Sequence, residues 1–348
     1  MLEPEWTWPD IEANLPIDVR GLMTFGPHLL TLDAEQAIGM IPRTLRQIVT
    51  NDLRRRGLVV GISGGIDSAL CAALSVRAMG SDRVLGLLMP EKGSTGNSLR
   101  LGRVVAESLG IQTITEDISL ALDALGCYRR QECAIKELVP DFNSEWKFKL
   151  VLPTALKSGR LPITSLVVQA PDGRREQLRL RADLYRVLVA ATNFKQRVRK
   201  MLEYYHGDRL QYAICGTPNR LEYDQGFFVK NGDGSADVKP IAHLYKSQVY
   251  QLARALGIPE EIIGQHPTTD TFSLEQTQEE FYFGMPYKSM DLCLYGLNHG
   301  VAPAEVAVHA GLTKSQVEFV YEDIRAKRRA TRYLHLGAQL VEPVQVML

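Results

Sequence analysis

Apolar and polar residues follow each other along this chain in the pattern of helices and buried strands. Apolar residues at helical spacing over Ile38–Val49 predict a first helix, with Asp33 as its N-cap. Leu58–Ser63 is apolar and β-branched without alternation, which is typical of a strand buried on both faces. Helices and strands then alternate over Ala69–Ala78, Val84–Met89, Leu99–Leu109 and Ile111–Thr115. This βαβαβ order predicts a parallel sheet.

The alternation fails between about residues 127 and 185. This stretch is mixed polar, and a tryptophan and two prolines interrupt any helix within it. Two alternating strands on either side of Pro171-Asp172-Gly173 predict a β-hairpin. We therefore expect an inserted β-rich subdomain over residues 127–185. The main domain would comprise residues 33–126 and 186–348, with residues 1–32 as an N-terminal tail.

After the insert the helical pattern resumes over Ala182–Tyr205, and Tyr212–Thr217 is another buried strand. Beyond Leu244 the apolar residues recur at helical spacing only, so no further strand is predicted. The helices predicted there are Tyr245–Leu256, Glu275–Phe283, Tyr287–Asn298, Ala302–Ala310 and Thr313–Arg329. The expected fold class is α/β, a doubly wound parallel sheet with flanking helices and a helical C-terminal region.

Composition and charge exclude several classes of function. The 348 residues are 45% hydrophobic and 23% charged, which is typical of a globular chain. Forty basic residues balance forty acidic ones, so the chain lacks the positive field that nucleic-acid and anionic-membrane binders use. Five cysteines without a CxxC pair argue against a disulfide scaffold or a zinc ribbon. The acidic N-terminus and the short apolar runs lead us to expect a cytoplasmic protein with no nucleic-acid or membrane partner.

A glycine- and serine-rich loop between a strand and a helix carries the clearest chemistry. Adjacent glycines allow close approach to a ligand, serines offer hydroxyl donors, and the helix start presents free N–H groups, so the loop is expected to bind polyphosphate. Its predicted nucleotide-binding residues are Gly61, Ile62, Ser63, Gly64, Gly65, Ile66 and Ser68. Neither the Walker A lysine nor GxGxxG is present. Asp67 would face phosphates, which favours a bridging Mg²⁺.

The motif SGGxDS after a strand resembles the pyrophosphate loop of the ATP pyrophosphatases, whose fold is of the adenine nucleotide α-hydrolase type. These enzymes cleave ATP between its α- and β-phosphates and adenylylate their substrate. The alternative is a Gly/Ser turn capped by Asp67 or Ser68, without a ligand. A second region, Cys215–Asp270, resembles the ammonia-dependent NAD synthetases through GTxxxxE, GFFTKxGDGxAD, a Lys-x-Gln helix and PTxDL. The sequence departs from that pattern at Val229 and Thr271.

The resemblance implies specific roles at the nucleotide site. Thr217 and Thr268 would contact ATP, Asp67 and Glu222 would hold Mg²⁺, and Lys246 would reach phosphate, with Asp67 and Lys246 counted as catalytic. The residues themselves agree in part, since Thr217 ends a buried strand at the sheet edge where open α/β folds bind ligands. Structural alternatives remain: Glu222 as a solvated acid, Lys246 as a surface residue and Thr268 as an N-cap.

The family's second substrate is nicotinate adenine dinucleotide, whose pyrophosphate and carboxylate require cationic partners. Lys230 and Asp237 stand where the family holds this substrate, and Arg197 lies in a segment similar to the family's NxxxRxR helix. A guanidinium fork suits bidentate phosphate binding. Lys327 lies in a basic closing segment similar to the family's, although a basic last helical turn that complements the helix dipole is an equal alternative.

The resemblance implies a reaction and partners. The nicotinate carboxylate would attack the α-phosphorus of ATP, and ammonia would then displace AMP to yield NAD, in a homodimer. About sixty residues precede the loop, too few for a glutaminase domain, so ammonia would be free or come from a separate glutaminase subunit, which we hypothesise the insert docks. One alternative is an amidating ligase of this fold acting on another carboxylate. A remote alternative is a DNA-binding regulator, because residues 303–332 resemble a helix-turn-helix.

Overall fold

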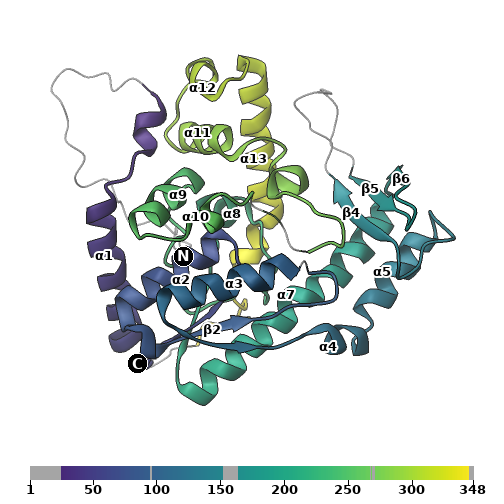
Figure 1. Cartoon of the computed structure of the whole chain (residues 1–348). Helices are drawn as coiled ribbons and strands as arrows, with labels where there is room; N and C mark the ends of the chain where they lie inside the picture. Colours follow the sequence, from purple (N-terminus) through teal and green to yellow (C-terminus); the bar gives the residue numbers. More distant parts are fainter. Residues whose placement is uncertain (1–24, 95, 152–163, 267, 269–270, 345–348) are drawn as a thin grey trace.

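The centre of the protein is a four-stranded parallel sheet. The computed structural model describes residues 25–94, 96–151, 164–266, 268 and 271–344 (Figure 1). The sheet has the order β3-β2-β1-β7 with every pair parallel, as predicted. Its strands are β1 (Leu58–Gly61), β2 (Val84–Leu88), β3 (Gln112–Thr115) and β7 (Ala213–Cys215). The chain winds outward from β1 to β3 and returns to β7 on the other side of β1. The carboxyl ends of β1 and β7 are therefore the switch point at which open sheets of this kind bind ligands.

Helices cover both faces of this sheet. On one face, Leu58 and Val60 belong to an apolar cluster to which four of the longer helices contribute. These are α1 (Ala34–Gln47), α2 (Ile66–Met79), α3 (Gly96–Leu109) and α9 (Lys246–Ala255). On the other face, Val59 packs against α4 (Ser119–Ala124) and the 29-residue α7 (Ala182–Leu210). Because Leu58, Val59 and Val60 are fully buried, β1 has the continuous apolar sequence from which a two-faced strand was predicted.

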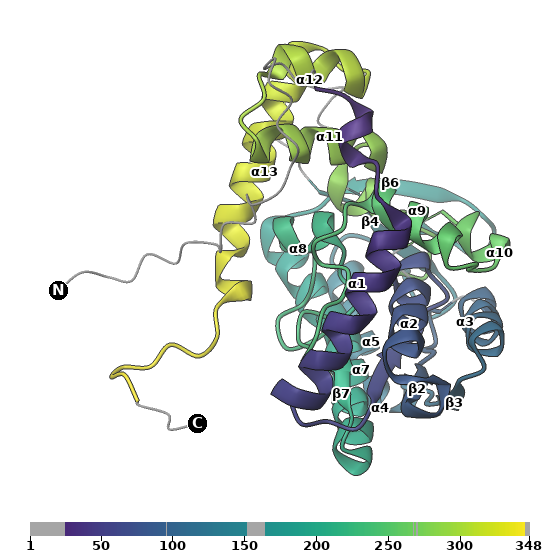
Figure 2. The ribbon, with the colours of Figure 1, turned by 90° about the vertical axis from the view of Figure 1, so that its left-hand side faces the viewer.

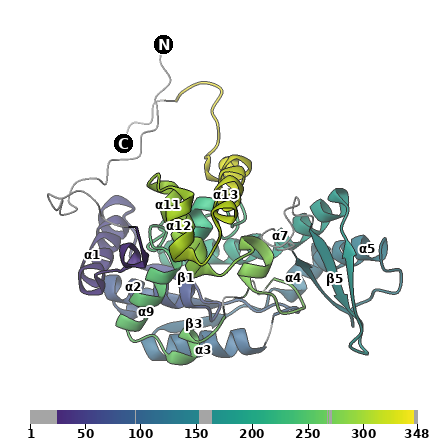
Figure 3. The same ribbon diagram turned by 90° about the horizontal axis from the view of Figure 1, so that it is seen from above.

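The insert contains a separate antiparallel sheet, at the opposite side of the molecule from α1 (Figures 1 and 3). Its strands are β4 (Lys147–Val151), β5 (Ser165–Gln169) and β6 (Arg175–Arg179). Strands β5 and β6 form the predicted hairpin, and Gly173 in its turn has a φ of 89°. The boundaries of the subdomain, residues 127–185, stay a prediction.

One helix of the insert was not expected. Helix α5 (Cys127–Lys136) occupies a stretch in which the mixed polar composition indicated no helix. It is amphipathic, and it packs against α7 with Ala134 and Ile135 buried. Tertiary contact with α7 therefore stabilises a polar helix of only 10 residues, which is too short to be stable alone.

The C-terminal helices form a second core, stacked at one end of the molecule in Figure 2. They are α11 (Tyr287–Asn298), α12 (Pro303–Ala310) and α13 (Lys314–His335), and the short helix α8 (Arg220–Gln225) adds Leu221 to the same core. The short helix α10 (Glu260–Ile263) packs instead against α2 and α9 in the first core. Phe25 and Leu30, from the stretch predicted as a tail, are buried in this core through the turn η1 (Pro27–Leu30). Among the described residues, no helix is both long and apolar enough to cross a bilayer.

The predicted helix Glu275–Phe283 is confirmed only in its later part. Gln278 and the helical turn η4 (Glu279–Phe283) are helical, whereas the residues before them run beside β4. Ser273 Oγ accepts a hydrogen bond from Phe148 N at 2.9 Å, and Leu274 N donates to Phe148 O at 3.1 Å. The unpaired backbone groups of the edge strand β4 thus compete with the local helical preference of this segment.

Candidate active site

The glycine–serine loop lies at the carboxyl end of β1, next to the carboxyl end of β7. Its hydroxyls interlock, because Ser68 Oγ donates to Gly65 O at 2.9 Å and lies 3.2 Å from Ser63 Oγ. Gly65 is the N-cap of α2, and it offers no side-chain bond to the first turn of that helix. The N–H groups at the start of α2 therefore remain available to an anion, which favours the ligand-binding interpretation over a simple capped turn.

Two acids and one lysine meet beside this loop. Asp67 comes from the first turn of α2, Glu222 from α8 and Lys246 from the first turn of α9. Lys246 Nζ forms an ion pair with Asp67 Oδ2, and its side chain is 2% exposed. Although burial alone lowers the pKa of Lys246, the nearby carboxylates of Asp67 and Glu222 raise it overall, so the lysine stays charged.

Asn219 joins the two acids. Its Nδ2 donates to Asp67 Oδ1 at 3.1 Å, and its backbone N donates to Glu222 Oε2 at 3.0 Å. Its own Oδ1 accepts from Leu221 N and Glu222 N, which completes a capping box at the start of α8. Because Asn219 is 1% exposed, these bonds hold the two carboxylates at one place on the sheet edge.

The electrostatics of Glu222 show that this place suits a cation. Burial and the charge of Asp67 together raise the pKa of Glu222 to about 8. A divalent ion bound between the two carboxylates would relieve the repulsion that raises the pKa of Glu222. Within the described ranges, no group of three or more His, Cys, Asp or Glu side chains could hold a metal. A pair of carboxylates is the kind of protein ligand that Mg²⁺ uses when waters or phosphate oxygens supply its other ligands.

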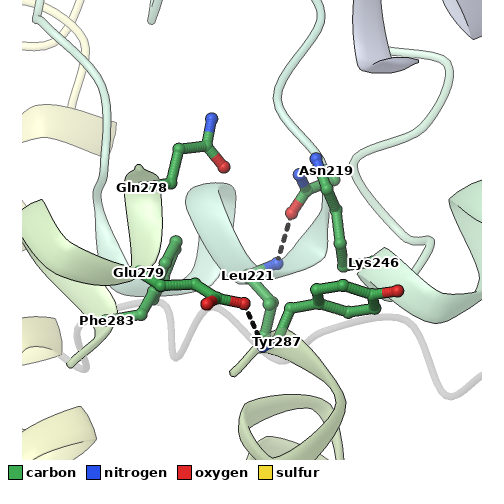
Figure 4. Close-up of a pocket in the computed structure, with 7 residues that line it drawn as sticks. All are labelled: Asn219, Leu221, Lys246, Gln278, Glu279, Phe283 and Tyr287. Carbon is green, nitrogen blue, oxygen red and sulfur yellow. Dashed lines mark hydrogen bonds between the residues drawn. The ribbon is translucent and has the colours of Figure 1, made fainter. Parts of the chain in front are cut away.

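A small pocket adjoins the acids (Figure 4). It is lined by Asn219, Leu221, Lys246, Gln278, Glu279, Phe283 and Tyr287. Gln278 Nε2 donates to Glu222 Oε1 at 2.9 Å, and Glu279 Oε1 accepts from Tyr287 N at 3.0 Å. Both residues belong to the segment that runs on from the edge of β4, so this segment borders the site.

The two predicted threonines lie near strand ends and loops. Thr217 was expected to end a strand, but β7 ends at Cys215, so Thr217 lies in the loop two residues further on, partly exposed and two residues before Asn219. Thr268 is exposed and forms an isolated bridge with Thr277. Their role as ATP contacts stays a prediction.

The four predicted substrate residues are engaged in protein contacts. Lys230 Nζ donates to the carbonyl oxygens of Tyr333 and Leu336 near the end of α13, and Arg197 Nε donates to Lys230 O at 3.3 Å. The other two residues also have protein partners. Asp237 Oδ2 accepts a hydrogen bond from Ile214 N at 2.7 Å, and Lys327 Nζ forms an ion pair with Asp323 at 2.7 Å. Arg197 and Lys230 therefore lie together, whereas Asp237 secures β7, and Lys327 on α13 pairs within its own helix and donates to Tyr282 O at 2.8 Å.

Two residues of the site were missed from the sequence. Asn219 precedes Glu222 by three positions, and this N-cap pattern was visible in the sequence before the structure was known. No sequence pattern indicated a role for Gln278, because its position depends on the contacts that β4 makes with the residues just before it.

An open parallel α/β sheet, with a glycine–serine loop and paired acids at its carboxyl edge, defines the class of ATP pyrophosphatases. The model of the NAD synthase family matches residues 38–144 and 141–332, and the chain belongs to that family. A relative from Mesorhizobium japonicum, named NH(3)-dependent NAD(+) synthetase, is 62% identical over 307 residues, which is 88% of this chain and 96% of the relative. A Rhizobium meliloti protein of the same name is 58% identical, over 93% of this chain and 96% of the relative.

Solved structures agree on the fold. The NH3-dependent NAD synthetase of Campylobacter jejuni has a TM-score of 0.58 at 22% identity, covering 89% of this chain and all of that one. The NMN synthetase of Francisella tularensis has a TM-score of 0.59 at 21% identity, with 90% and 100% coverage. At this identity the likeness concerns the fold alone.

We expect Gly64→Ala to disrupt the loop. Gly64 has a φ of 82°, and a Cβ there would lie 2.8 Å from Ser98 O. The variant should lose about 2 kcal/mol of unfolding free energy in urea and most of its ATP affinity. Gly110→Ala is the matched control, since Gly110 has a φ of 63° but open space around its Cβ position. Equal effects of the two substitutions on ATP binding would contradict this expectation.

We expect Glu222→Gln to change how stability depends on pH. The native carboxyl keeps a proton that the unfolded chain releases between about pH 4.5 and 8, so the unfolding free energy of the metal-free protein falls as pH rises through that window. The variant lacks this titration. Its stability relative to the natural protein should rise by about 1–3 kcal/mol from pH 5 to pH 8.5, measured by urea unfolding in EDTA. Parallel pH curves would refute the raised pKa.

Proposed function

We propose that this protein makes NAD by ATP-dependent amidation of nicotinate adenine dinucleotide, with release of AMP and pyrophosphate. The observation that carries the proposal is the 54–62% identity, over most of the chain, to relatives named NH(3)-dependent NAD(+) synthetase. The grouping of Asp67, Asn219, Glu222 and Lys246 beside the loop supports it, because phosphate chemistry needs such charges at a sheet edge.

The reaction requires activation of a carboxylate, which is a poor electrophile as an anion. The carboxylate attacks the α-phosphorus of ATP, and negative charge develops on the departing pyrophosphate. The N–H groups at the start of α2 and the charged Lys246 are suited to stabilise that charge. Asp67 and Glu222 would hold Mg²⁺, which neutralises phosphate charge when it is bound. Asn219 orients both carboxylates for this task.

We propose further substrate contacts on the strength of the family resemblance. Thr217 and Thr268 would contact ATP. Arg197 and Lys230, which are already neighbours, would bind an anionic part of the dinucleotide. Asp237 and Lys327 would contact the same substrate, and Lys327 would first have to leave Asp323 and the carbonyl of Tyr282.

We also propose ammonia as the nitrogen donor and a homodimer as the assembly. The names of the curated relatives support ammonia. A separate glutaminase subunit remains a possible source of that ammonia and would not alter the site. Neither alternative from the sequence is favoured: the relatives name no other carboxylate, and the apolar residues of α12 and α13 are buried in a common core with α11.

The function is tested with purified protein, ATP, Mg²⁺ and nicotinate adenine dinucleotide. Ammonium should support stoichiometric formation of NAD, AMP and pyrophosphate, followed by chromatography, because the described site provides for adenylylation and not for glutamine hydrolysis. Glutamine at the same concentration should give only background activity. Pyrophosphate exchange into ATP should depend on the dinucleotide acid. Equal rates with glutamine, or ADP in place of AMP, would exclude the proposal.

We expect Lys246→Met to reduce kcat by at least about 100-fold, because the cation that balances Asp67 and the departing pyrophosphate is lost. NAD formation at saturating substrates measures the effect. Lys314→Met is the matched control, since Lys314 also opens a helix but its side chain is 66% exposed and its partner Glu318 lies 3.5 Å away. A similar loss in both variants would argue against a specific role of Lys246.

A further inference from the structure

Residues 271–283 connect the insert sheet with the acid cluster. On the insert side, Leu274 N donates to Phe148 O, Phe148 N donates to Ser273 Oγ, and Gln276 Nε2 donates to Leu150 O. These bonds alternate along β4, so the segment covers the edge of β4 that β5 leaves open. The insert therefore holds a piece of chain that lies about 120 residues further along the sequence.

Aromatic packing strengthens this contact. Phe272 is 5% exposed and belongs to the same apolar cluster as the insert strands. Its ring lies 5.6 Å from that of Phe148 on β4 and 5.5 Å from that of Phe281 in η4. Phe281 in turn lies 5.9 Å from Phe227, close to the end of α8. A chain of rings thus runs from the insert toward the helix that carries Glu222.

An ion pair fixes the far end of the segment. Lys149 Nζ on β4 lies 2.8 Å from each carboxylate oxygen of Glu280, and it donates to Glu275 O at 3.3 Å. The two side chains are 17% and 35% exposed, so water screens the pair only in part. Glu280 follows Gln278 by two residues, and Gln278 Nε2 holds Glu222 Oε1 at 2.9 Å. Lys149 is therefore linked through a short piece of chain to a predicted metal ligand.

The start of the segment is also tied to the nucleotide side of the molecule. Lys195 Nζ on α7 donates to Thr271 O at 2.7 Å and to Glu91 Oε1 at 2.6 Å, in the loop that follows β2. Tyr128 OH on α5 donates to the second oxygen of Glu91 at 2.8 Å. The side chains of Lys195 and Glu91 are 4% and 0% exposed, so this pair is effectively buried.

We propose that the insert sheet is a positioning element of the active site. The edge of β4 holds residues 271–283, and the Lys149–Glu280 pair sets Gln278 against Glu222, so that the carboxylate keeps the orientation needed beside Asp67. Lys149 and Glu280 are positioning residues that act through Gln278 without touching substrate. The activity part of this inference rests on the proposed function, whereas the tethering part does not.

A charge swap tests the pair. Lys149→Glu and Glu280→Lys should each lower kcat about tenfold and raise the Mg²⁺ concentration needed for half-maximal rate, because like charges drive the segment from β4. The double variant restores an opposite-charge pair and should recover most of the loss. Lys136→Glu is the control, since Lys136 pairs with Glu132 at 2.6 Å on α5 without contact to the segment. It should stay within about twofold of the natural protein.

Hydrogen exchange separates tethering from catalysis. In both single variants, amides of residues 274–284 should exchange faster, including those of Leu274, Phe281 and Gly284, which are hydrogen-bonded in the natural protein. Peptides from β5 and β6 should be unchanged, which would show that the insert stays folded. Unchanged exchange and rate in both single variants, or a double variant as impaired as either single one, would overturn the inference. If the natural protein makes no NAD, the proposed function fails while the exchange result still decides the tethering.

Discussion

The site depends on how one lysine and two carboxylates share a poorly hydrated place at the edge of a parallel sheet. Lys246 balances Asp67 directly, and the remaining excess of negative charge appears as the raised pKa of Glu222. Such a set is costly without a partner, since a buried unpaired charge destabilises a fold by several kcal/mol. A bound cation and a polyphosphate would complete the charge balance and remove this destabilisation. A cluster of charges that is unbalanced without ligands is therefore a sign of a functional site.

The sheet topology is what brings these groups together. Strands β1 and β7 are neighbours, although about 150 residues separate them in the sequence, and each leads into a loop at the same edge. The helix that follows β1 supplies Asp67, and the helix after β7 supplies Glu222. Asp291 on α11 then accepts from the backbone N–H groups of Lys246 and Ser247, which fixes the start of α9 beside them.

Sequence reasoning succeeded where local pattern decides structure and failed where distant contacts do. The phosphate loop, the buried strand before it and the hairpin at Gly173 follow from glycine conformations and apolar runs, which the chain carries locally. Helix α5 was missed because it is short and polar, so that its stability depends on packing against α7. The first part of the helix predicted over Glu275–Phe283 was wrong because β4, far away in sequence, offers its free edge to residues 273–276. Gln278 escaped notice for the same reason.

These failures concern the part of the molecule that joins the insert to the site. An uncovered edge strand invites pairing with other chains, so β4 needs something along it. Residues 271–276 provide that cover, and in doing so they bring Gln278 within 2.9 Å of Glu222. A contact that protects an edge thus also orients a carboxylate. The segment meets the backbone of β4 through one backbone N–H and through two polar side chains, Ser273 and Gln276. These groups form no periodic pattern in the sequence, so only the fold reveals the pairing.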